Sequence, residues 1–321
     1  MSASDAQQRA QRGVAERRPR GGGPSAEFTA ALASFPKGIA VPGDTYDVVR
    51  AKFKPAHGHD PGPDIATEPA SYGGVSGVWV SLKEKPQQPG DSVILFLHGG
   101  ALVSCSAPEY TFYAAWFVRA TGLRAFIPDY RLAPEHRFPA ALDDCVAAYQ
   151  GLVASGVAPE RIALVGDSCG GGFVVTTLVK LRDLGAQQPA CGVSLGGWLD
   201  AEVSGDSARN PVADDVFVNP EWMRARWRDY LGPAGDARHP HVSPIHAELR
   251  GLPPLLLQYG QIDNLRDDGV RLAARAGRAG VAVTLEIWPG MIHGFVGLHG
   301  FCPEPAEAVK HVAQFVARHT G

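Results

Sequence analysis

The chain has 321 residues and a formal net charge of −3, and 45% of its residues are hydrophobic. This balance offers no basic field for nucleic acid, and the longest apolar runs fall far short of the roughly 18 residues of a membrane span. The 38 glycines and 26 prolines indicate many turns. Their combined share of the residues stays below the ~25–30% that is typical of low-complexity chains. The composition therefore predicts a globular protein with a large core.

The first 26 residues are rich in arginine, end in glycines 21–23, and contain no apolar stretch. They predict a disordered, solvated tail. The alternative is an arginine-rich transit peptide, but such peptides contain few acidic residues, and this segment contains Asp5 and Glu16. No secretory signal is indicated. The five cysteines are widely spaced and form no C-x-x-C pair, so neither a disulfide framework nor a zinc site is indicated, and a cytoplasmic location is expected.

The predicted elements begin with a helical segment over 25–35, for which Ser25 is a plausible N-cap. Residues 46–53 and 72–83 can supply helices or strands, and the β-branched and aromatic run 78–82 indicates a strand. The order of these first elements stays open.

From residue 91 the pattern becomes regular, because short apolar runs alternate with stretches of helical periodicity. The predicted strands are 93–97, 124–127, 162–165, 191–195, 255–259 and 281–287, and the predicted helices are 110–120, 140–154, 173–184, 265–278 and 305–319. Continuously apolar strands alternating with helices predict a mostly parallel sheet covered on both faces, that is, an α/β fold.

The stretch 201–248 interrupts this alternation, because it contains a helix near 219–231 but no convincing strand. We expect it to form a lid together with the N-terminal segment. The predicted organisation is a tail over 1–26 and a single domain over 27–321, with cap elements from about 27–55 and 201–235.

A G-x-S-x-G pattern lies between the strand 162–165 and the helix 173–184, with Ser168 at its centre. At such a sharp strand-to-helix turn the central residue adopts strained backbone angles, and glycines on either side avoid clashes. We therefore expect Ser168 to be a nucleophile. Cys169 is a rival nucleophile, but a turn centred on it would place Asp167 where a side chain is crowded.

Glycines also follow the strand 93–97, in the sequence His98-Gly99-Gly100-Ala101. Backbone N–H groups in such a loop can bind the oxyanion of a tetrahedral intermediate. The expected donors are the N–H groups of Gly99, Gly100 and Cys169, and His98 is expected to orient the loop. The alternative is an ordinary glycine turn after a strand.

A serine nucleophile needs a histidine base, and the histidine needs a carboxylate that fixes its tautomer. Asp263 follows the strand 255–259 and His293 follows the strand 281–287, and α/β sheets place their ligands at these strand ends. Asp263 and His293 are therefore the expected acid and base.

The chain also offers alternatives to this acid and base. Asp267 and Asp268 compete with Asp263 but fall in the next predicted helix, and His299 is the second choice of base. A further group, His239, His241 and His246, lacks an acidic partner cluster, so no metal site is expected.

Six motifs together resemble the hormone-sensitive-lipase-like branch of the α/β-hydrolase family, from residue 91 to the C-terminus. They are His98-Gly-Gly-Ala101, Asp129-Tyr-Arg-Leu-Ala-Pro-Glu135, Gly166-Asp-Ser-Cys-Gly-Gly171, Ser243-Pro244, Gly251-Leu-Pro-Pro254 and Met291-Ile-His-Gly-Phe295. The resemblance implies a cofactor-free serine carboxylesterase with the α/β-hydrolase fold and a helical cap, which hydrolyses short- to medium-chain esters. It assigns the same six residues: the triad Ser168, Asp263 and His293, and the oxyanion donors Gly99, Gly100 and Cys169.

Three departures from the family's pattern affect the surroundings of the substrate. Ala101 replaces a third glycine, Cys169 replaces the usual alanine, and Gly196-Gly197-Trp198 stands where Ser-Pro-Trp is common. The acyl preference therefore stays open, as do lactonase, acyltransferase and non-catalytic receptor functions.

The expected pocket residues are Leu102, Trp198, Phe217, Trp222, Phe295 and Phe28. The expected partner is a small ester, without nucleic acid or membrane, and the protein is expected to be a monomer or homodimer.

Overall fold

The computed structural model describes residues 14–16, 23–34, 38–54, 58–85, 88, 90–211 and 217–321. Its centre is a nine-stranded sheet in the order β1-β9-β8-β7-β6-β4-β5-β3-β2. The strands are β1 Val14–Glu16, β2 Ile65–Tyr72, β3 Val75–Leu82, β4 Val93–Leu97, β5 Arg124–Pro128, β6 Ile162–Asp167, β7 Cys191–Leu195, β8 Leu255–Gly260 and β9 Val283–Trp288. Pairing is parallel from β1 to β5, whereas β3 runs antiparallel to β5 and to β2. The predicted α/β fold with a mostly parallel sheet is confirmed.

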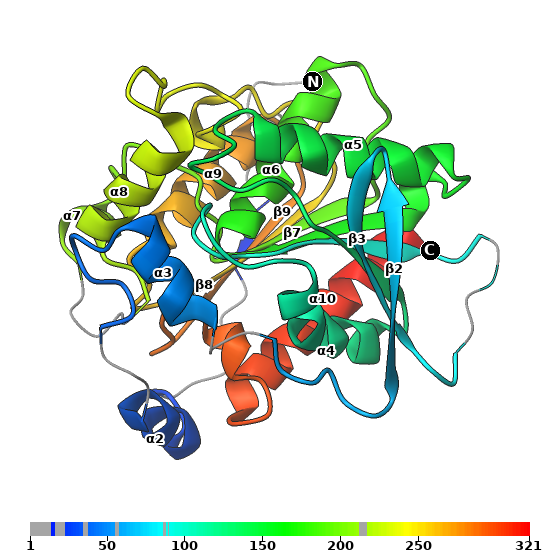
Figure 1. Ribbon diagram of the computed structural model, residues 1–321, viewed down its shortest axis with the longest axis horizontal. Coiled ribbons are helices and arrows are strands. Elements are labelled where there is room, and N and C mark those ends of the chain that lie inside the picture. The colour runs from blue at the N-terminus through cyan, green and yellow to red at the C-terminus, as the bar shows by residue number, and fades with distance from the viewer. Residues whose placement is uncertain are drawn as a thin grey trace, which may run out of the picture.

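Helices cover both faces of the sheet. The α-helices are α2 Ala26–Ser34, α3 Tyr46–Phe53, α4 Thr111–Thr121, α5 Ala140–Ala154, α6 Cys169–Asp183, α7 Asp206–Arg209, α8 Pro220–Leu231, α9 Arg266–Arg278 and α10 Pro303–Thr320, and short 3₁₀ turns span Pro108–Tyr110, Pro159–Arg161, Pro244–His246 and Phe295–Leu298. Figure 1 shows α5, α6 and α9 above the sheet and α4 and α10 below it. Each face has its own hydrophobic core, the upper core on the side of α5, α6 and α9 and the lower core on the side of α4 and α10.

The central strands β4, β6, β7 and β8 are buried along their whole length. This burial on both faces explains why they could be predicted as continuous apolar runs. The edge strand β2 was not predicted as a separate strand. Only its first residue, Ile65, is buried, and it contains Pro69, which edge strands tolerate because proline cannot donate to the ladder.

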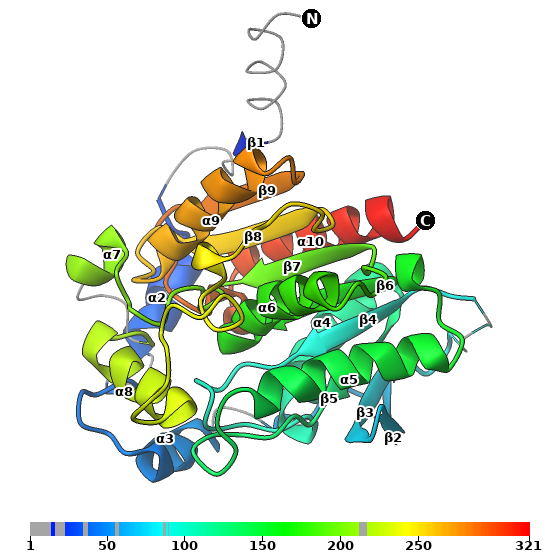
Figure 2. The same cartoon turned by 90° about the horizontal axis from the view of Figure 1, so that it is seen from above.

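Helices α3 and α8, which belong to the two segments predicted to form the cap, lie beside the carboxyl ends of the strands. They lie next to each other in Figures 1 and 2, and the rings of Phe53 and Trp222 are 6.2 Å apart. Arg226 of α8 adds a hydrogen bond to the carbonyl of Asp44, just before α3. In contrast, α2 lies away from this pair, and its Phe28 is buried in the lower core.

Most of the predicted tail, residues 1–13 and 17–22, lies outside the described residues. Within it, Val14–Glu16 pairs in parallel with β9 at the sheet edge. A second attachment lies at Ser25, which donates through its backbone N–H and its Oγ to Glu304 of α10. Ser25 Oγ also accepts from Phe28 N, as its predicted role as helix cap requires.

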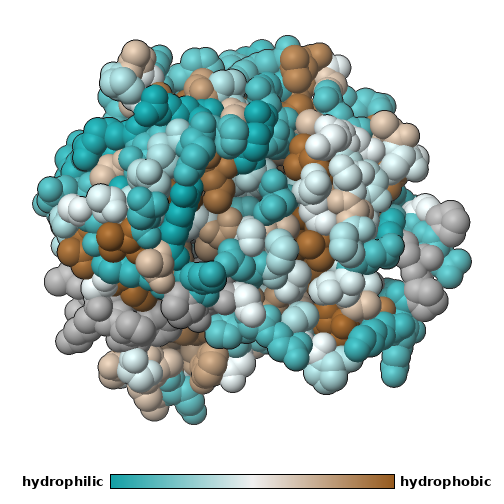
Figure 3. Space-filling model, in the orientation of Figure 1, coloured by the Kyte–Doolittle hydropathy of each residue, from teal (hydrophilic) through white to brown (hydrophobic). Residues whose placement is uncertain are grey.

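The surface in the orientation of Figure 1 is mainly hydrophilic, with hydrophobic side chains in separate small groups (Figure 3). Among the residues that the structure describes, no helix is both long and apolar enough to cross a membrane.

Candidate active site

Ser168 lies at the sharp turn between β6 and α6. Its backbone angles are φ 54° and ψ −124°, a left-handed conformation that is costly for a residue with a side chain. Its backbone N–H donates to Leu195 O over 2.8 Å, which fixes the turn. A Cβ atom added at Gly166 would lie 2.3 Å from Gly170 O, and one at Gly170 would lie 2.1 Å from Leu97 O. Both glycines of the pattern are therefore required by close packing.

Helix α6 begins at Cys169 and not at residue 173 as predicted. The predicted start was wrong because glycines 170–172 have low helix propensity. They are needed in the first turn because neighbouring backbone lies against it; a Cβ atom at Gly172 would be 2.3 Å from Trp198 O. The early start places the helix N-terminus, with its partial positive charge, directly beside Ser168.

The structure brings Ser168, His293 and Asp263 into one hydrogen-bonded line. Ser168 Oγ is 2.9 Å from His293 Nε2, and His293 Nδ1 is 3.1 Å from Asp263 Oδ2. Asp263 is 1% exposed and His293 is 5% exposed, so the pair is shielded from water. Asp263 Oδ1 accepts from Leu265 N over 2.7 Å, which fixes the carboxylate. A proton on Nδ1, facing Asp263, would make Nε2 the acceptor toward the hydroxyl of Ser168.

The competing acids and the second-choice base are engaged elsewhere. Asp267 accepts from Ser207 N over 2.8 Å, and Asp268 accepts from Arg271 over 2.7 Å. His299 stacks on Trp116, with ring centroids 4.9 Å apart, and burial lowers its pKa.

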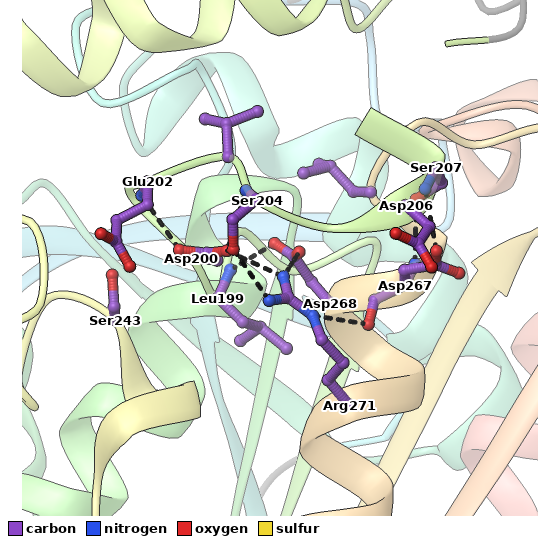
Figure 4. A network of polar contacts seen from close by, with 12 residues as sticks. Leu199, Asp200, Glu202, Ser204, Asp206, Ser207, Ser243, Asp267, Asp268 and Arg271 are labelled. Carbon is purple, nitrogen blue, oxygen red and sulfur yellow. Dashed lines mark hydrogen bonds and ion pairs between the residues drawn. The ribbon is translucent and has the colours of Figure 1, made fainter. Parts of the chain in front are cut away.

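One cluster among the described residues could supply three metal ligands, namely Asp200, Glu202 and His246, whose donor atoms lie within 4.8 Å of one another. Figure 4 shows that Arg271 already occupies the side of Asp200 that faces α9. It donates to Asp200 over 2.8 Å, and Ser204 donates to the same carboxylate oxygen over 2.6 Å. The positive charge beside Asp200 is thus supplied by a side chain of the protein.

The loop after β4 brings Gly99 and Gly100 to the elbow, that is, the sharp turn between β6 and α6 at Ser168. A Cβ atom at Gly99 would lie 2.4 Å from the hydroxyl of Tyr110; Gly100 has φ 118°, and a Cβ there would lie 2.0 Å from Ser104 O. Within the described part of the chain, the backbone N–H groups of these two glycines donate to no other group. The N–H of Cys169 belongs to the first residue of α6, where a helix offers no internal acceptor.

His98 orients the beginning of this loop. Its Nδ1 atom is 2.7 Å from Gly99 O, and its ring stacks on Tyr130 with centroids 4.0 Å apart. Tyr130 in turn donates to His98 O over 2.6 Å.

The side chain of Cys169 also has a role that the sequence did not reveal. Its Sγ accepts from the backbone N–H of Leu102 over 3.3 Å. Burial raises the pKa of this thiol to about 12, so it is neutral at ordinary pH. A neutral, buried thiol is a poor nucleophile, which argues against the rival assignment of Cys169.

A buried carboxylate next to the nucleophile was likewise missed. Asp167 accepts from the hydroxyls of Tyr110 and Tyr113 over 3.1 and 2.9 Å. Burial first, and the charge of Asp167 second, hold the pKa of both tyrosines well above its usual value. The tyrosines are three positions apart, a spacing that places them on one side of a helical turn, but nothing in the sequence pairs them with Asp167.

Gly196, one of the departures from the family pattern, lies beside the base. It has φ 57°, and a Cβ atom there would be 3.0 Å from His293 Cε1 and 3.1 Å from Nδ1. Gly196, Asp263 and Gly294 are among the residues that line a cavity of about 10 Å³ behind the triad, about the size of one water molecule.

The six predicted pocket residues divide between the two cores. Leu102, Trp198 and Trp222 belong to the upper core, whereas Phe28 and Phe295 belong to the lower core. Phe217 packs against both. Leu102 and Trp198 are close to the elbow, because Leu102 contacts Cys169 and the N–H of Trp198 donates to Ser168 O over 3.4 Å. A pocket role for the six stays a prediction.

Comparison with known proteins agrees with this geometry. The α/β-hydrolase fold family matches residues 94–297, and the chain belongs to that family, in its hormone-sensitive-lipase-like branch. A solved esterase from the bacterial hormone-sensitive lipase family is 37% identical, with a TM-score of 0.85 over 92% of this chain and 99% of that one. The acetyl-hydrolase of Streptomyces hygroscopicus is 36% identical over 237 residues, 74% of this chain and 79% of that protein. The ethyl acetate hydrolase of Pseudomonas putida is 29% identical over 236 residues, 71% and 73% of the two chains.

Proposed function

We propose that the protein is a serine carboxylesterase that hydrolyses short- to medium-chain carboxylic esters. The observation that carries this proposal is the line of hydrogen bonds from Ser168 through His293 to Asp263, at the ends of three parallel strands. The relatives named as an acetyl-hydrolase and an ethyl acetate hydrolase support ester hydrolysis and a short acyl group.

In the acylation half-reaction, Ser168 Oγ attacks the ester carbonyl carbon while His293 Nε2 takes the hydroxyl proton. The carbonyl oxygen becomes an oxyanion, which the N–H groups of Gly99, Gly100 and Cys169 bind. Such preorganised donors contribute about 10²–10³ in rate each. The intermediate then collapses, the bond to the alcohol oxygen breaks, and the alcohol leaves with the proton from His293.

Deacylation repeats these steps with water. His293 takes a proton from a water molecule, whose oxygen attacks the acyl carbon of the acyl-enzyme. The second intermediate expels Ser168 Oγ, which recovers its proton from His293, and the carboxylic acid is released. Every proton moves between groups of this chain and the reactants, so the proposal requires no cofactor or metal ion.

The test of this proposal is the Ser168→Ala variant with a panel of p-nitrophenyl esters and lactones. We expect it to lower hydrolysis of p-nitrophenyl acetate by about 10⁴-fold or more. Ser155→Ala is the matched control. Ser155 lies at the C-terminus of α5, outside the candidate active site, where its Oγ donates a hydrogen bond to Leu152 O. Near-normal turnover by Ser168→Ala would reject the assignment.

Two further measurements separate the alternatives. A serine-directed phosphonate should label Ser168 in the wild type, and labelling of Cys169 instead would favour the thiol. A wild-type protein that binds esters without cleaving any member of the panel would favour a receptor, whereas faster turnover of lactones than of open esters would favour a lactonase.

We also propose a cytoplasmic protein, monomeric or homodimeric. All five cysteines are free and four of them are buried, as is typical of a reducing compartment. Size-exclusion chromatography with light scattering would determine the oligomeric state.

A further inference from the structure

Arg50 connects the cap to the catalytic domain through four hydrogen bonds. It lies on α3, one of the two cap helices. Its Nε donates to Val103 O over 2.7 Å, and its Nη2 donates to Ala133 O over 3.2 Å. The two Nη atoms also bind both carboxylate oxygens of Glu135, over 2.8 and 2.7 Å. One guanidinium thus holds two separate loops of the catalytic domain.

The first of these loops carries Gly99 and Gly100. After the glycines it contains three residues in the left-handed region, the consecutive pair Ala101 with φ 56° and Leu102 with φ 70°, and then Cys105 with φ 70°. Such residues cost about 1–2 kcal/mol each and persist only where their surroundings enforce them. The conformation of this loop therefore depends on the contacts around it.

Arg50 supports that conformation both directly and through a neighbour. It binds Val103 O, the carbonyl next to the strained pair. Ala133, whose carbonyl accepts from Arg50, donates its own N–H to Leu102 O over 3.1 Å. The carbonyls of Leu102 and Val103 are therefore both held, one by the Ala133 backbone and one by the guanidinium.

The geometry of the guanidinium suits this task. Its planar fork binds the carboxylate of Glu135 in a bidentate manner and leaves Nε aimed at Val103. The side chains are partly exposed, 33% for Arg50 and 51% for Glu135, so the ion pair itself adds little stability. The hydrogen bond to Arg50 lowers the pKa of Glu135 to about 2, which keeps the pair charged under ordinary conditions.

We propose that Arg50 is a positioning residue for the oxyanion loop, so that helix α3 of the cap is part of the catalytic apparatus as well as a cover. The proposal rests on the proposed esterase function for its kinetic consequence, but the contact it describes can be measured without any substrate.

The kinetic test compares Arg50→Met with Lys52→Met. Lys52 lies on the same helix, and its partners among the described residues are Asp44 and Gly38 O, both within the cap. For Arg50→Met we expect kcat for p-nitrophenyl acetate to fall about 10- to 100-fold, with KM within about twofold, because a misplaced oxyanion donor affects the transition state more than substrate binding. Lys52→Met should keep the wild-type kcat. Arg50→Lys should recover only part of the loss, because an ammonium group lacks the planar fork.

The substrate-free test is hydrogen exchange of the peptide covering residues 99–105. We expect this peptide to exchange at least about tenfold faster in Arg50→Met than in the wild type, and at the wild-type rate in Lys52→Met. Unchanged exchange would overturn the proposal, whatever the protein hydrolyses. A wild type without esterase activity would contradict the proposed function instead, so the two failures are distinguishable.

Thermal unfolding separates positioning from a general loss of folding. If Arg50→Met lowers the melting temperature but keeps the wild-type kcat well below the transition, Arg50 only fastens the cap and the proposal is wrong. If Arg50→Met does not fold, Arg50→Lys and Glu135→Gln take its place. Faster exchange over 99–105 in either variant supports the proposal, and unchanged exchange in both overturns it.

Discussion

The Sγ atom of Cys169 accepts a hydrogen bond from the backbone N–H of Leu102 over 3.3 Å. This contact joins the residue after Ser168, the proposed nucleophile, to the strained part of the proposed oxyanion loop. Leu102 is 3% exposed, so its N–H has little access to water as a replacement. Cys169 thus contacts this loop through its side chain, in addition to the proposed role of its backbone N–H.

We expect Cys169→Ala to lower kcat about fivefold, because loss of the sulfur acceptor leaves a buried donor, at about 1 kcal/mol. Cys169→Ser should keep most of the activity, since its hydroxyl can accept the same bond. Steady-state kinetics on p-nitrophenyl acetate measures both variants. A kcat for Cys169→Ala equal to that of the wild type would show that the sulfur does not position the loop.

Gly196→Ala should lower kcat by about 100-fold, because its new Cβ would stand 3.0 Å from the ring of His293 and displace the base. Gly300→Ala is the matched control, since Gly300 has φ 91° but no atom within 4 Å of an added Cβ. Both variants carry the backbone strain of a left-handed alanine, about 1 kcal/mol. Equal kcat values for the two variants would exclude a steric effect on His293.

Tyr113→Phe should lower the free energy of unfolding by about 1.5–3 kcal/mol, because it removes a hydrogen bond to the buried carboxylate of Asp167. Tyr149→Phe is the control, since the Tyr149 hydroxyl donates to a neutral acceptor, Gln187 O, over 2.9 Å. Its loss should cost about 1 kcal/mol. Urea denaturation measures both variants, and a smaller effect at Tyr113 than at Tyr149 would contradict an ionised Asp167.

The free energy of unfolding should fall as the pH rises from about 4 to 7, through Asp268. Burial, and secondarily the charge of Asp200, raises the pKa of Asp268 to about 7. In the unfolded chain the pKa of Asp268 is near 3.8. Between these two values Asp268 is therefore protonated in the folded state and ionised in the unfolded state. One proton per molecule gives a slope of at most about 1.4 kcal/mol per pH unit.

The measurement is urea denaturation of the wild type and Asp268→Asn at several pH values. Asp268→Asn should remove this part of the slope, and Asp267→Asn, the substitution at the adjacent position, should retain it. An identical pH dependence in the wild type and Asp268→Asn would show that Asp268 titrates alike in the folded and unfolded states.

Much of the fold could be predicted from the sequence because the central strands are buried on both faces. Their apolar runs locate the strand ends, and the carboxyl ends of parallel strands meet at one edge of the sheet. That is why Ser168, Asp263 and His293, up to 125 positions apart, could be proposed together. Their catalytic roles stay a prediction, although the structure brings the three side chains into contact.

The parts that were missed depend on packing partners, which local patterns do not contain. The glycines after Cys169 indicate a loop by propensity, but neighbouring groups, such as Trp198 O beside Gly172, require glycine in the first turn of α6. Arg50 looks like an ordinary surface cation of an amphipathic segment, and its partners Val103 and Glu135 lie 53 and 85 positions away. Only the folded chain shows that these residues meet.

The order of the segments along the chain has a consequence for biosynthesis. The oxyanion loop and Ser168 belong to the first half of the sequence or lie close to its middle, whereas Asp263 and His293 come from the last two strands of the sheet, β8 and β9. A ribosome therefore makes Ser168, the proposed nucleophile, long before His293, the base proposed to activate it. Since serine is a weak nucleophile without its histidine, a nascent chain should stay chemically inert toward cellular esters until β9 has joined the sheet.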